Sequence, residues 1–224
     1  MTSHSMMHLY EEKQSSYYSD SRADLVELVV GAGLVVLDIG CGAGDMGKKL
    51  IELGKASWVS GVEIVRRQAE IAAAVLNEVI IGDISELELT WLHGRFDYII
   101  AGDVLEHLAD PWGVLKRLKP LLRDGGTLLV SIPNVRNWLI LSQLILRGDW
   151  QYHKDGILDE THLRFFTRRS AIRLLHDSGY TVASVQPYFW GPKSRRCNSL
   201  TFGLFEEFLA RNWLIVAHPC AEDQ

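Results

Sequence analysis

Residues 36–47 read VLDIGCGAGDMG, a hydrophobic run that ends in closely spaced glycines. The run has the length and β-branched content of a strand that is buried on both faces of a sheet. Gly40, Gly42 and Gly44 permit backbone conformations that other residues avoid, and they let a ligand approach the main chain. A strand that leads into such a loop and then into a helix is typical of α/β proteins that bind an adenosine-containing cofactor.

The rest of the chain alternates strand-like and helix-like stretches, which predicts a doubly wound α/β fold with a mostly parallel, seven-stranded sheet. We expect strands at residues 35–39, 57–62, 79–81, 96–101, 127–132, 180–185 and 213–217. We expect helices at residues 46–54, 66–76, 111–122, 168–177 and 199–209, and a glycine-, proline- and arginine-containing loop at residues 191–196. Residues 1–224 are therefore predicted to form a single domain, preceded by a polar N-terminal arm at residues 1–20.

The regular alternation lapses between residues 134 and 166. An irregular connection of this length in a compact domain is more often functional than a plain connector. It holds several aromatic and ionisable side chains, among them Trp138, Trp150, Phe165 and His162. We therefore expect this segment to form a lid over a bound acceptor, with some of its aromatic residues in contact with that acceptor.

Composition narrows the classes of partner. The 23 Lys and Arg residues against 28 Asp and Glu give a net charge of −5, which disfavours a nucleic acid as partner. The three cysteines are scattered, which argues against a disulfide framework and a zinc site and suits the cytoplasm. No apolar stretch reaches the length of a membrane span, and the run at residues 139–146 predicts a buried or lid helix.

Two classes of cofactor use a glycine loop of this kind. Gly42, Gly44 and Gly47 form the GxGxxG pattern of dinucleotide-binding proteins. Glu63 follows Gly42 at about the 20-residue spacing that is expected of the acid that binds the ribose in a nicotinamide-dependent oxidoreductase. Asp38 favours the other class, because a carboxylate at the mouth of the loop repels a pyrophosphate but attracts the sulfonium and ammonium of S-adenosylmethionine. Several strands also end in acidic residues at the sheet edge where α/β folds bind ligands.

The chain resembles the class I S-adenosylmethionine-dependent methyltransferases, in particular the type 11/23-like branch that acts on small molecules. VLDIGCGAG at residues 36–44 is similar to the first motif of that family, and Gly82-Asp83-Ile84 to its adenine motif. FDYIIAGDVLEHLADP at residues 96–111 resembles the fourth motif, and residues 159–167 resemble a DxTHLRFFT signature of one subgroup. The resemblance covers nearly the whole chain and implies a Rossmann-like fold, S-adenosylmethionine as cofactor and S-adenosylhomocysteine as product.

The resemblance also implies roles for individual residues. Gly40 and Gly42 would lie against the methionine part of the cofactor with Asp38 near its ammonium, and Glu63 would bind the ribose hydroxyls. The further cofactor-binding residues that it implies are Asp83 and Ile84 at the adenine, Asp103, Val104 and Leu105 beneath the sulfonium, and Tyr17, Tyr18 and Arg22 of the arm over the cofactor.

Two histidines are candidates for the acceptor side of the reaction. His162 stands in the irregular segment next to Asp159 and Glu160, which could hold one ring nitrogen while the other faces the acceptor as a base or as an orienting group. His107 follows the fourth predicted strand. Either histidine could instead be a structural anchor. No metal is expected, because methyl transfer from a sulfonium depends mainly on positioning.

The sequence thus predicts methyl transfer to a hydroxyl or amine of a small molecule. A nicotinamide-dependent oxidoreductase and a non-catalytic S-adenosylmethionine-binding module remain as alternatives. The acceptor, the methylated atom and the oligomeric state stay open at this stage.

Overall fold

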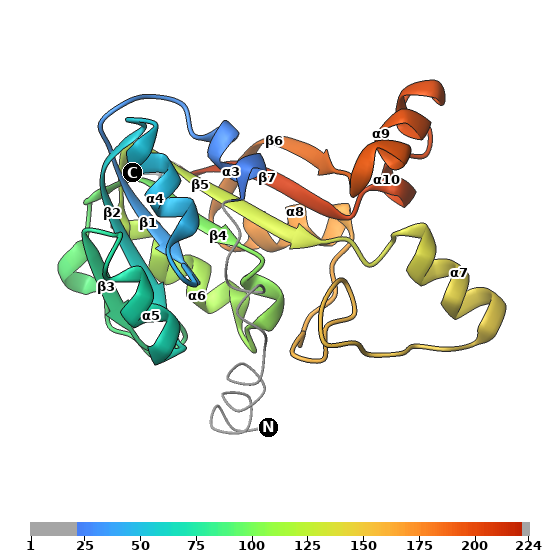
Figure 1. The fold of residues 1–224 in the computed structure, drawn as a ribbon, viewed down its shortest axis with the longest axis horizontal. Helices are drawn as coiled ribbons and strands as arrows, with labels where there is room; N and C mark the ends of the chain where they lie inside the picture. The colour runs from blue at the N-terminus through green and yellow to red at the C-terminus, as the bar shows by residue number, and fades with distance from the viewer. Residues whose placement is uncertain (1–21, 221–224) are drawn as a thin grey trace.

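The computed structural model describes residues 22–220, which form a seven-stranded sheet with helices on both faces (Figure 1). The strands are β1 (Leu34–Ile39), β2 (Ala56–Glu63), β3 (Glu78–Ile81), β4 (Phe96–Gly102), β5 (Leu122–Pro133), β6 (Tyr180–Tyr188) and β7 (Asn212–Pro219). They are ordered β3-β2-β1-β4-β5-β7-β6. Only β7 runs antiparallel to its neighbours, β5 and β6. The predicted doubly wound, mostly parallel sheet is confirmed.

Two hydrophobic cores lie on opposite faces of this sheet, because successive side chains of a strand point to opposite sides. Val36 of β1 packs in one core with Leu25 and Leu50, while Leu37 belongs to the other core together with Leu115. The helices of the first face are α3 (Ala23–Leu28), α4 (Asp45–Glu52) and α5 (Arg66–Ala72), and those of the second are α6 (Pro111–Leu118) and α8 (Arg168–Asp177).

Proline and glycine explain where the predicted boundaries were wrong. The helix expected at residues 111–122 ends at Leu118 and continues as the 3-10 helix η3 (Lys119–Leu121), since Pro120 lacks the N–H that an α-helix needs. Residues 191–196 are not a loop but the start of α9 (Gly191–Leu200), because a proline is well tolerated in a first helical turn. Phe202 and Gly203 have positive φ and separate α9 from α10 (Glu206–Leu209).

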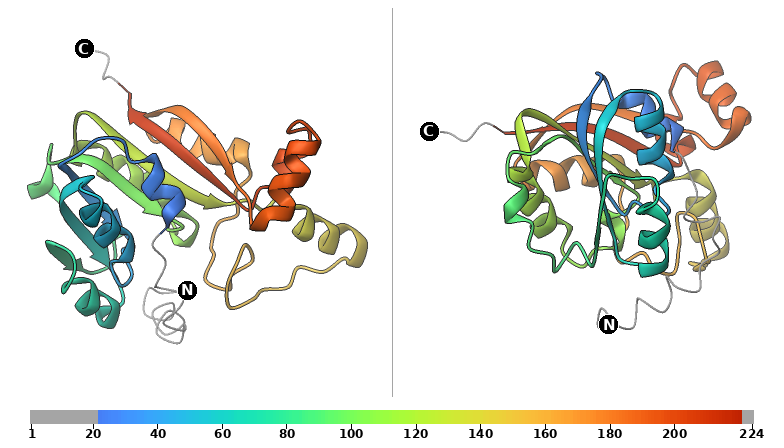
Figure 2. Two further views of the ribbon diagram at one scale, coloured as in Figure 1. Left: turned by 45° about the horizontal axis from the view of Figure 1, so that its top comes forward. Right: turned by 60° about the vertical axis from the view of Figure 1, so that its left-hand side comes forward.

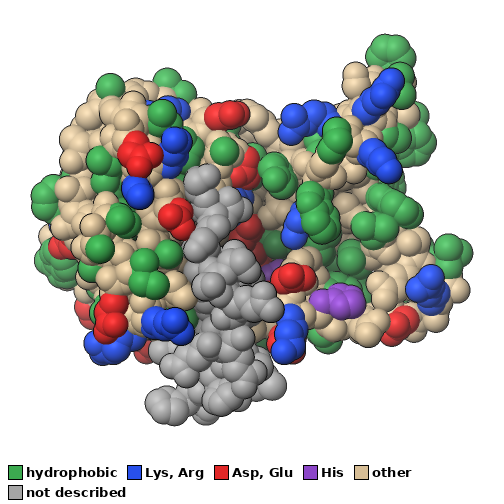
Figure 3. All heavy atoms as spheres, viewed as in Figure 1, with side chains coloured by type: hydrophobic (Ala, Val, Ile, Leu, Met, Phe, Trp, Pro, Cys, Tyr) green, Lys and Arg blue, Asp and Glu red, His purple; other side chains and the backbone are tan. Residues whose placement is uncertain are grey.

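The irregular segment contains one helix, α7 (Trp138–Arg147), which projects with α9 from one end of the molecule (Figures 1 and 2). The expected helix forms here, but none of its residues is buried, so the alternative of a buried helix was wrong. Leu146 of α7 is 81% exposed and Phe202 beyond α9 is 99% exposed. Hydrophobic and basic side chains share this end in Figure 3. Among residues 22–220, no helix is both long and apolar enough to cross a membrane.

The parallel strands place their carboxyl ends at one edge of the sheet. Ile39 at the end of β1 pairs in register with Val62 of β2 and with Ala101 of β4. The loops that follow β1, β2, β3 and β4 therefore meet at this edge, which is where open α/β sheets bind ligands.

Candidate active site

The loop after β1 is held in a conformation that glycine alone adopts easily. Gly40, Gly42 and Gly44 have φ of 69°, 55° and 85°, in the left-handed region. A Cβ atom on Gly40 would lie 2.8 Å from Cγ2 of Val104, so the loop after β4 packs directly against this glycine. The sequence pattern thus produces a bare stretch of backbone at the sheet edge.

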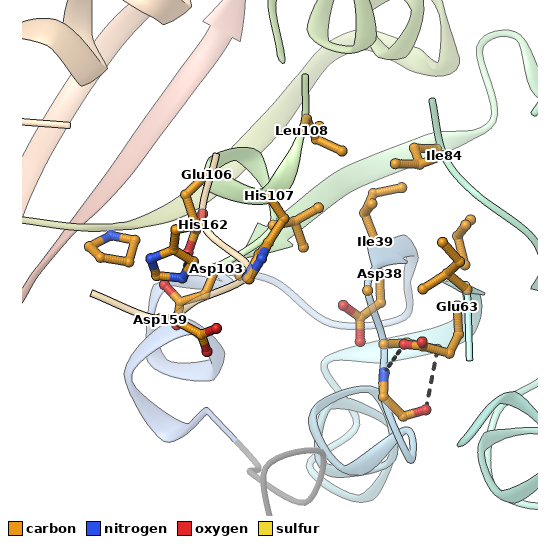
Figure 4. A pocket seen from close by; sticks show the side chains of 18 of the residues that line it. Asp38, Ile39, Glu63, Ile84, Asp103, Glu106, His107, Leu108, Asp159 and His162 are labelled. Carbon is orange, nitrogen blue, oxygen red and sulfur yellow. Dashed lines mark hydrogen bonds and ion pairs between the residues drawn. The ribbon is translucent and has the colours of Figure 1, made fainter. Parts of the chain in front are cut away.

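Glu63 ties this loop to the end of β2. Its Oε2 accepts a hydrogen bond from the N–H of Gly42 at 2.9 Å (Figure 4). Its Oε1 accepts one from the N–H of Val65 at 2.8 Å. The side chain is buried, and this burial raises the pKa of its carboxyl group, although the backbone hydrogen bonds counteract the shift. Glu63 therefore orients the glycine loop in addition to facing the cleft.

Asp38 places a second buried carboxylate beside the loop. Its side chain is 2% exposed, and among the described residues its Oδ2 has no hydrogen-bond partner. Burial is the main cause that raises the pKa of Asp38 to about 8; the neighbouring charge of Glu63 adds to the shift and Arg22 opposes it. A buried, unpartnered carboxylate favours a cationic ligand, because a positive charge nearby compensates for the lost hydration.

Asp103 joins four elements at the carboxyl end of β4. Its Oδ1 accepts hydrogen bonds from Ser131 Oγ at 2.7 Å and from Asn212 Nδ2 at 2.6 Å, and its Oδ2 accepts one from Arg22 at 2.7 Å. Its backbone has φ of 57°, which is unusual for a residue other than glycine. We did not predict Ser131 and Asn212 as site residues, because nothing in the local sequence links them to Asp103.

The loop after β3 closes the far side of the site. Asp83 Oδ1 accepts a hydrogen bond from the N–H of Ser85 at 2.8 Å, and Ile84 is buried. Arg117 of α6 donates to the carbonyls of Ile84 and Ser85 at 2.8 and 2.7 Å. A carboxylate and an apolar side chain are thus fixed next to each other at the end of β3, and their role at the adenine stays a prediction.

These loops surround one cleft of about 670 Å³. This volume lies within the roughly 300–1,000 Å³ of typical small-molecule sites. The predicted residues that line it are Arg22, Asp38, Gly40, Gly42, Glu63, Asp83, Ile84, Asp103, Val104, His107 and His162. Leu105 is not among these lining residues, because η2 (Leu105–His107) turns its side chain into the core, where it is fully buried. Its expected place beneath the sulfonium stays a prediction. Tyr17 and Tyr18 lie outside the described residues.

Glu106, His107 and His162 form a histidine cluster at the end of the cleft away from Glu63 (Figure 4). The centroids of the two imidazole rings are 4.6 Å apart in an edge-to-face arrangement. Nδ1 of His162 lies 3.0 Å from the carbonyl oxygen of Ile157, so a backbone group holds the nitrogen for which we expected a carboxylate of Asp159 or Glu160. Nε2 of His162 lies 3.9 Å from Oε1 of Glu106.

We did not predict Glu106, although it stands next to His107 in the sequence. It is 1% exposed, and among the described residues neither of its carboxylate oxygens has a hydrogen-bond partner. Burial, and secondarily the charge of Asp103, raises the pKa of Glu106 well above its usual range. The Glu106-His107 pair directly after a buried strand was a sequence signal for a functional site. Only the turn of η2 shows that the side chains of both Glu106 and His107 reach the cleft.

Comparison with known protein families decides between the two cofactor classes. A family model described as a methyltransferase domain matches residues 10–185, most of the chain. The chain belongs to the class I S-adenosylmethionine-dependent methyltransferases. The GxGxxG pattern of Gly42, Gly44 and Gly47 was therefore a chance match to the dinucleotide fingerprint, and the family implies S-adenosylmethionine as the cofactor.

Individual relatives of this methyltransferase domain agree with the assignment. A ubiquinone biosynthesis O-methyltransferase of Bradyrhizobium diazoefficiens is 36% identical over 127 residues, which cover 53% of this chain and 47% of the relative. A protein of the same name from Nitrobacter winogradskyi is 33% identical over 167 residues, which cover 66% of this chain and 60% of the relative. The match thus spans about half of these relatives' length. The fold is similar to that of a possible histamine N-methyltransferase of Thermotoga maritima, with a TM-score of 0.64, 22% identity and coverage of 95% and 99%.

The residues of the cleft fit the cofactor that the family implies. The left-handed glycines leave room for a ligand against the backbone, and the unpartnered Oδ2 of Asp38 suits an ammonium group.

The aromatic residues of the irregular segment fit less well with the expected acceptor contacts. Trp150 and Phe165 pack edge to face with centroids 5.2 Å apart, Trp138 is half-exposed, and none of the three is among the residues that line the cleft.

Proposed function

We propose that this methyltransferase domain transfers a methyl group from S-adenosylmethionine to a hydroxyl or amine of a small molecule. The observation that carries the proposal is the division of one cleft into two chemically distinct ends. Asp38 and Glu63 supply buried carboxylates at one end, and the histidine cluster lies at the other, with Asp103 beside the cluster (Figure 4). Cofactor and acceptor would therefore meet near Asp103.

On the cofactor side, the chain's residues bind and orient. Gly40 and Gly42 would lie against the methionine part, Asp38 would pair with its ammonium, and Glu63 would accept hydrogen bonds from the ribose hydroxyls. Asp83 and Ile84 would hold the adenine, while Asp103 and Val104 would lie beneath the sulfonium, with Arg22 and the arm residue Tyr18 over the cofactor. When bound, the cofactor supplies a methyl group that its sulfonium already activates, so the alignment of the acceptor supplies much of the catalysis.

On the acceptor side, His162, with His107 beside it, would act on the nucleophile as a base or as an orienting group. A hydroxyl acceptor must lose its proton during methyl transfer, whereas an amine need only be unprotonated. The names of the two relatives, both O-methyltransferases, favour a hydroxyl. The net charge of −5 disfavours a nucleic acid as acceptor and agrees with a small molecule.

Transfer of a labelled methyl group tests this proposal. The protein is incubated with methyl-labelled S-adenosylmethionine and separate pools of small phenols, alcohols and amines, and the products are identified by mass spectrometry. We expect the label in the methyl ether of a hydroxyl-containing acceptor, and a rate lower by about 10²–10⁴ in His162→Gln, which cannot take up a proton. Cofactor binding without transfer to any pool would instead support a non-catalytic S-adenosylmethionine-binding module.

A further inference from the structure

The histidine cluster has the composition of a metal site. One nitrogen of each imidazole and a carboxylate oxygen of Glu106 all lie within 4.8 Å of one another. Two imidazoles and one carboxylate are a ligand set that proteins use for divalent transition metals such as Zn²⁺ and Fe²⁺. From this juxtaposition we propose that Glu106, His107 and His162 bind one divalent transition-metal ion at the acceptor end of the cleft.

The hydrogen bonds of the two rings orient them for this role. Nδ1 of His162 lies 3.0 Å from the carbonyl oxygen of Ile157, and Nδ1 of His107 lies 3.2 Å from that of Thr161. A carbonyl oxygen only accepts, so in each neutral ring the proton sits on Nδ1 and Nε2 keeps its lone pair. Metal-binding histidines typically donate their second nitrogen to a carbonyl or carboxylate in this way. Nε2 of His162 faces Glu106 at 3.9 Å.

The electrostatic surroundings of Glu106 favour a cation. Its two carboxylate oxygens are buried and have no hydrogen-bond partner among residues 22–220, which is costly for a charged group. Asp103 and Asp159 are near enough to add their negative charge to its surroundings, and Arg22 opposes them. A divalent ion held by Glu106 would compensate for both the lost hydration and this repulsion.

The local fold holds the three ligands in a common frame. Glu106 and His107 belong to η2, while His162 lies in the segment that returns from α7. The N–H groups of Leu163 and Arg164 donate to the carbonyl of Glu106 at 2.8 and 2.9 Å, which fixes this segment against η2. Asp159 Oδ1 accepts from Thr161 Oγ1 at 2.6 Å, and that hydroxyl lies 3.1 Å from Nδ1 of His107.

The site would give the proposed reaction a specific acceptor chemistry, and this part rests on the proposed function. Three protein ligands leave coordination positions open toward the cleft, where a hydroxyl oxygen of the acceptor can bind. Coordination lowers the pKa of that hydroxyl, so its proton leaves to water before the O–CH₃ bond forms and the C–S bond breaks, with the electron pair remaining on sulfur. His162 would then be a metal ligand rather than the base.

Titration of chelator-treated protein with Co²⁺ tests the site without cofactor, acceptor or turnover. We expect one ion per chain, with visible absorption bands typical of nitrogen and oxygen ligands, and displacement by Zn²⁺. Glu106→Gln keeps the shape of the side chain, and His162→Gln retains much of its size. Each should weaken Co²⁺ binding by about 100-fold or more, since even an outer-shell partner is worth about 10–100-fold. His176→Gln, on an exposed surface of α8, is the matched control and should bind like the wild type.

The outcomes separate this inference from the proposed function. Circular dichroism checks that each variant is folded, and S-adenosylhomocysteine binding is measured in parallel. If Co²⁺ does not bind, or binds equally well to Glu106→Gln and His162→Gln, the metal site is wrong and the cluster is a buried Glu106–His162 pair, whether or not the cofactor product binds. Co²⁺ binding that depends on the cluster, without binding of S-adenosylhomocysteine, would support the metal site and contradict the proposed function.

Discussion

Glu63 links two tasks in one carboxylate. It accepts hydrogen bonds from the N–H groups of Gly42 and Val65, which shape the glycine loop, and it is proposed to accept two more from the ribose. Hydrogen bonds to charged groups contribute about 1.5–3 kcal/mol. We therefore expect Glu63→Ala to weaken binding of S-adenosylhomocysteine roughly tenfold to a hundredfold in calorimetric titrations.

The exposed Glu52 provides a control for this substitution. It is the last residue of α4, the helix that follows the same loop, and it forms surface ion pairs with Lys48 and Lys49. Glu52→Ala should therefore bind S-adenosylhomocysteine as the wild type does. Unchanged affinity in a folded Glu63→Ala variant would remove Glu63 from the cofactor site.

The raised pKa of Asp38 predicts a pH-dependent affinity. With a pKa of about 8, this carboxyl is mainly protonated below pH 7 in the unliganded protein. An ammonium beside it would stabilise the ionised form, so binding of S-adenosylhomocysteine should release a proton and strengthen as the pH rises from 5.5 to 7. Calorimetry in buffers of different ionisation enthalpy measures the released proton.

Asp38→Asn isolates this contribution from that of Glu63, whose pKa is also raised by burial. The amide cannot release a proton, so the variant should bind the product more weakly and with a flatter pH dependence over the same range. A wild-type affinity that is constant or falls between pH 5.5 and 7 would mean that no cation binds beside Asp38.

At the scale of elements, residues 134–166 combine a fixed frame with an exposed helix. The N–H of Val135 donates to the carbonyl of Phe166 at 2.9 Å, which brings the two ends of the segment together. Between them, α7 has no buried residue, while Asp159, Thr161 and His162 are buried near the cleft. We propose that the part between α7 and Phe166 is the lid over the acceptor.

Hydrogen exchange tests this proposal. Exchange at residues 148–166 should slow when S-adenosylhomocysteine and an acceptor bind, because the ligands would hold this part of the segment against η2. Helix α8, which packs with α6 in the core on the second face of the sheet, should exchange at an unchanged rate. If residues 148–166 already exchange as slowly as β4 and β5 without ligand, the segment is a fixed part of the core rather than a lid.

Local sequence signals predicted the elements well and the tertiary contacts poorly. The hydrophobic run before Gly40 and the helix-capping residue Asp110 are local signals that a single sequence shows. Asp110, for example, accepts a hydrogen bond from the N–H of Gly113, only three residues away. The bonds of Asp103 to Ser131 and Asn212 join residues far apart in the chain. Only the order of β4, β5 and β7 in the sheet brings them together.

At the scale of the whole molecule, the cleft also combines parts that local sequence signals predict with parts that depend on tertiary contacts. The motif residues after β1, β2 and β3 were predictable because parallel strands must end at one edge. The histidine cluster was only half predictable, since Glu106 and His107 come from η2 and His162 from a segment whose path no periodic pattern shows. The inward turn of Leu105 belongs to the same irregular backbone.

The central claim is that this cleft binds S-adenosylmethionine. Calorimetric titration of the protein with S-adenosylmethionine, S-adenosylhomocysteine, NAD and NADP tests it most directly, with Gly42→Val as the comparison. Gly42 has φ of 55°, where valine is strained, so this variant should lose binding while its far-ultraviolet circular dichroism stays near that of the wild type. We predict that the two S-adenosyl compounds bind at one site per chain and that neither dinucleotide binds. Binding of NAD or NADP, or undiminished binding of S-adenosylhomocysteine by Gly42→Val, would contradict the account.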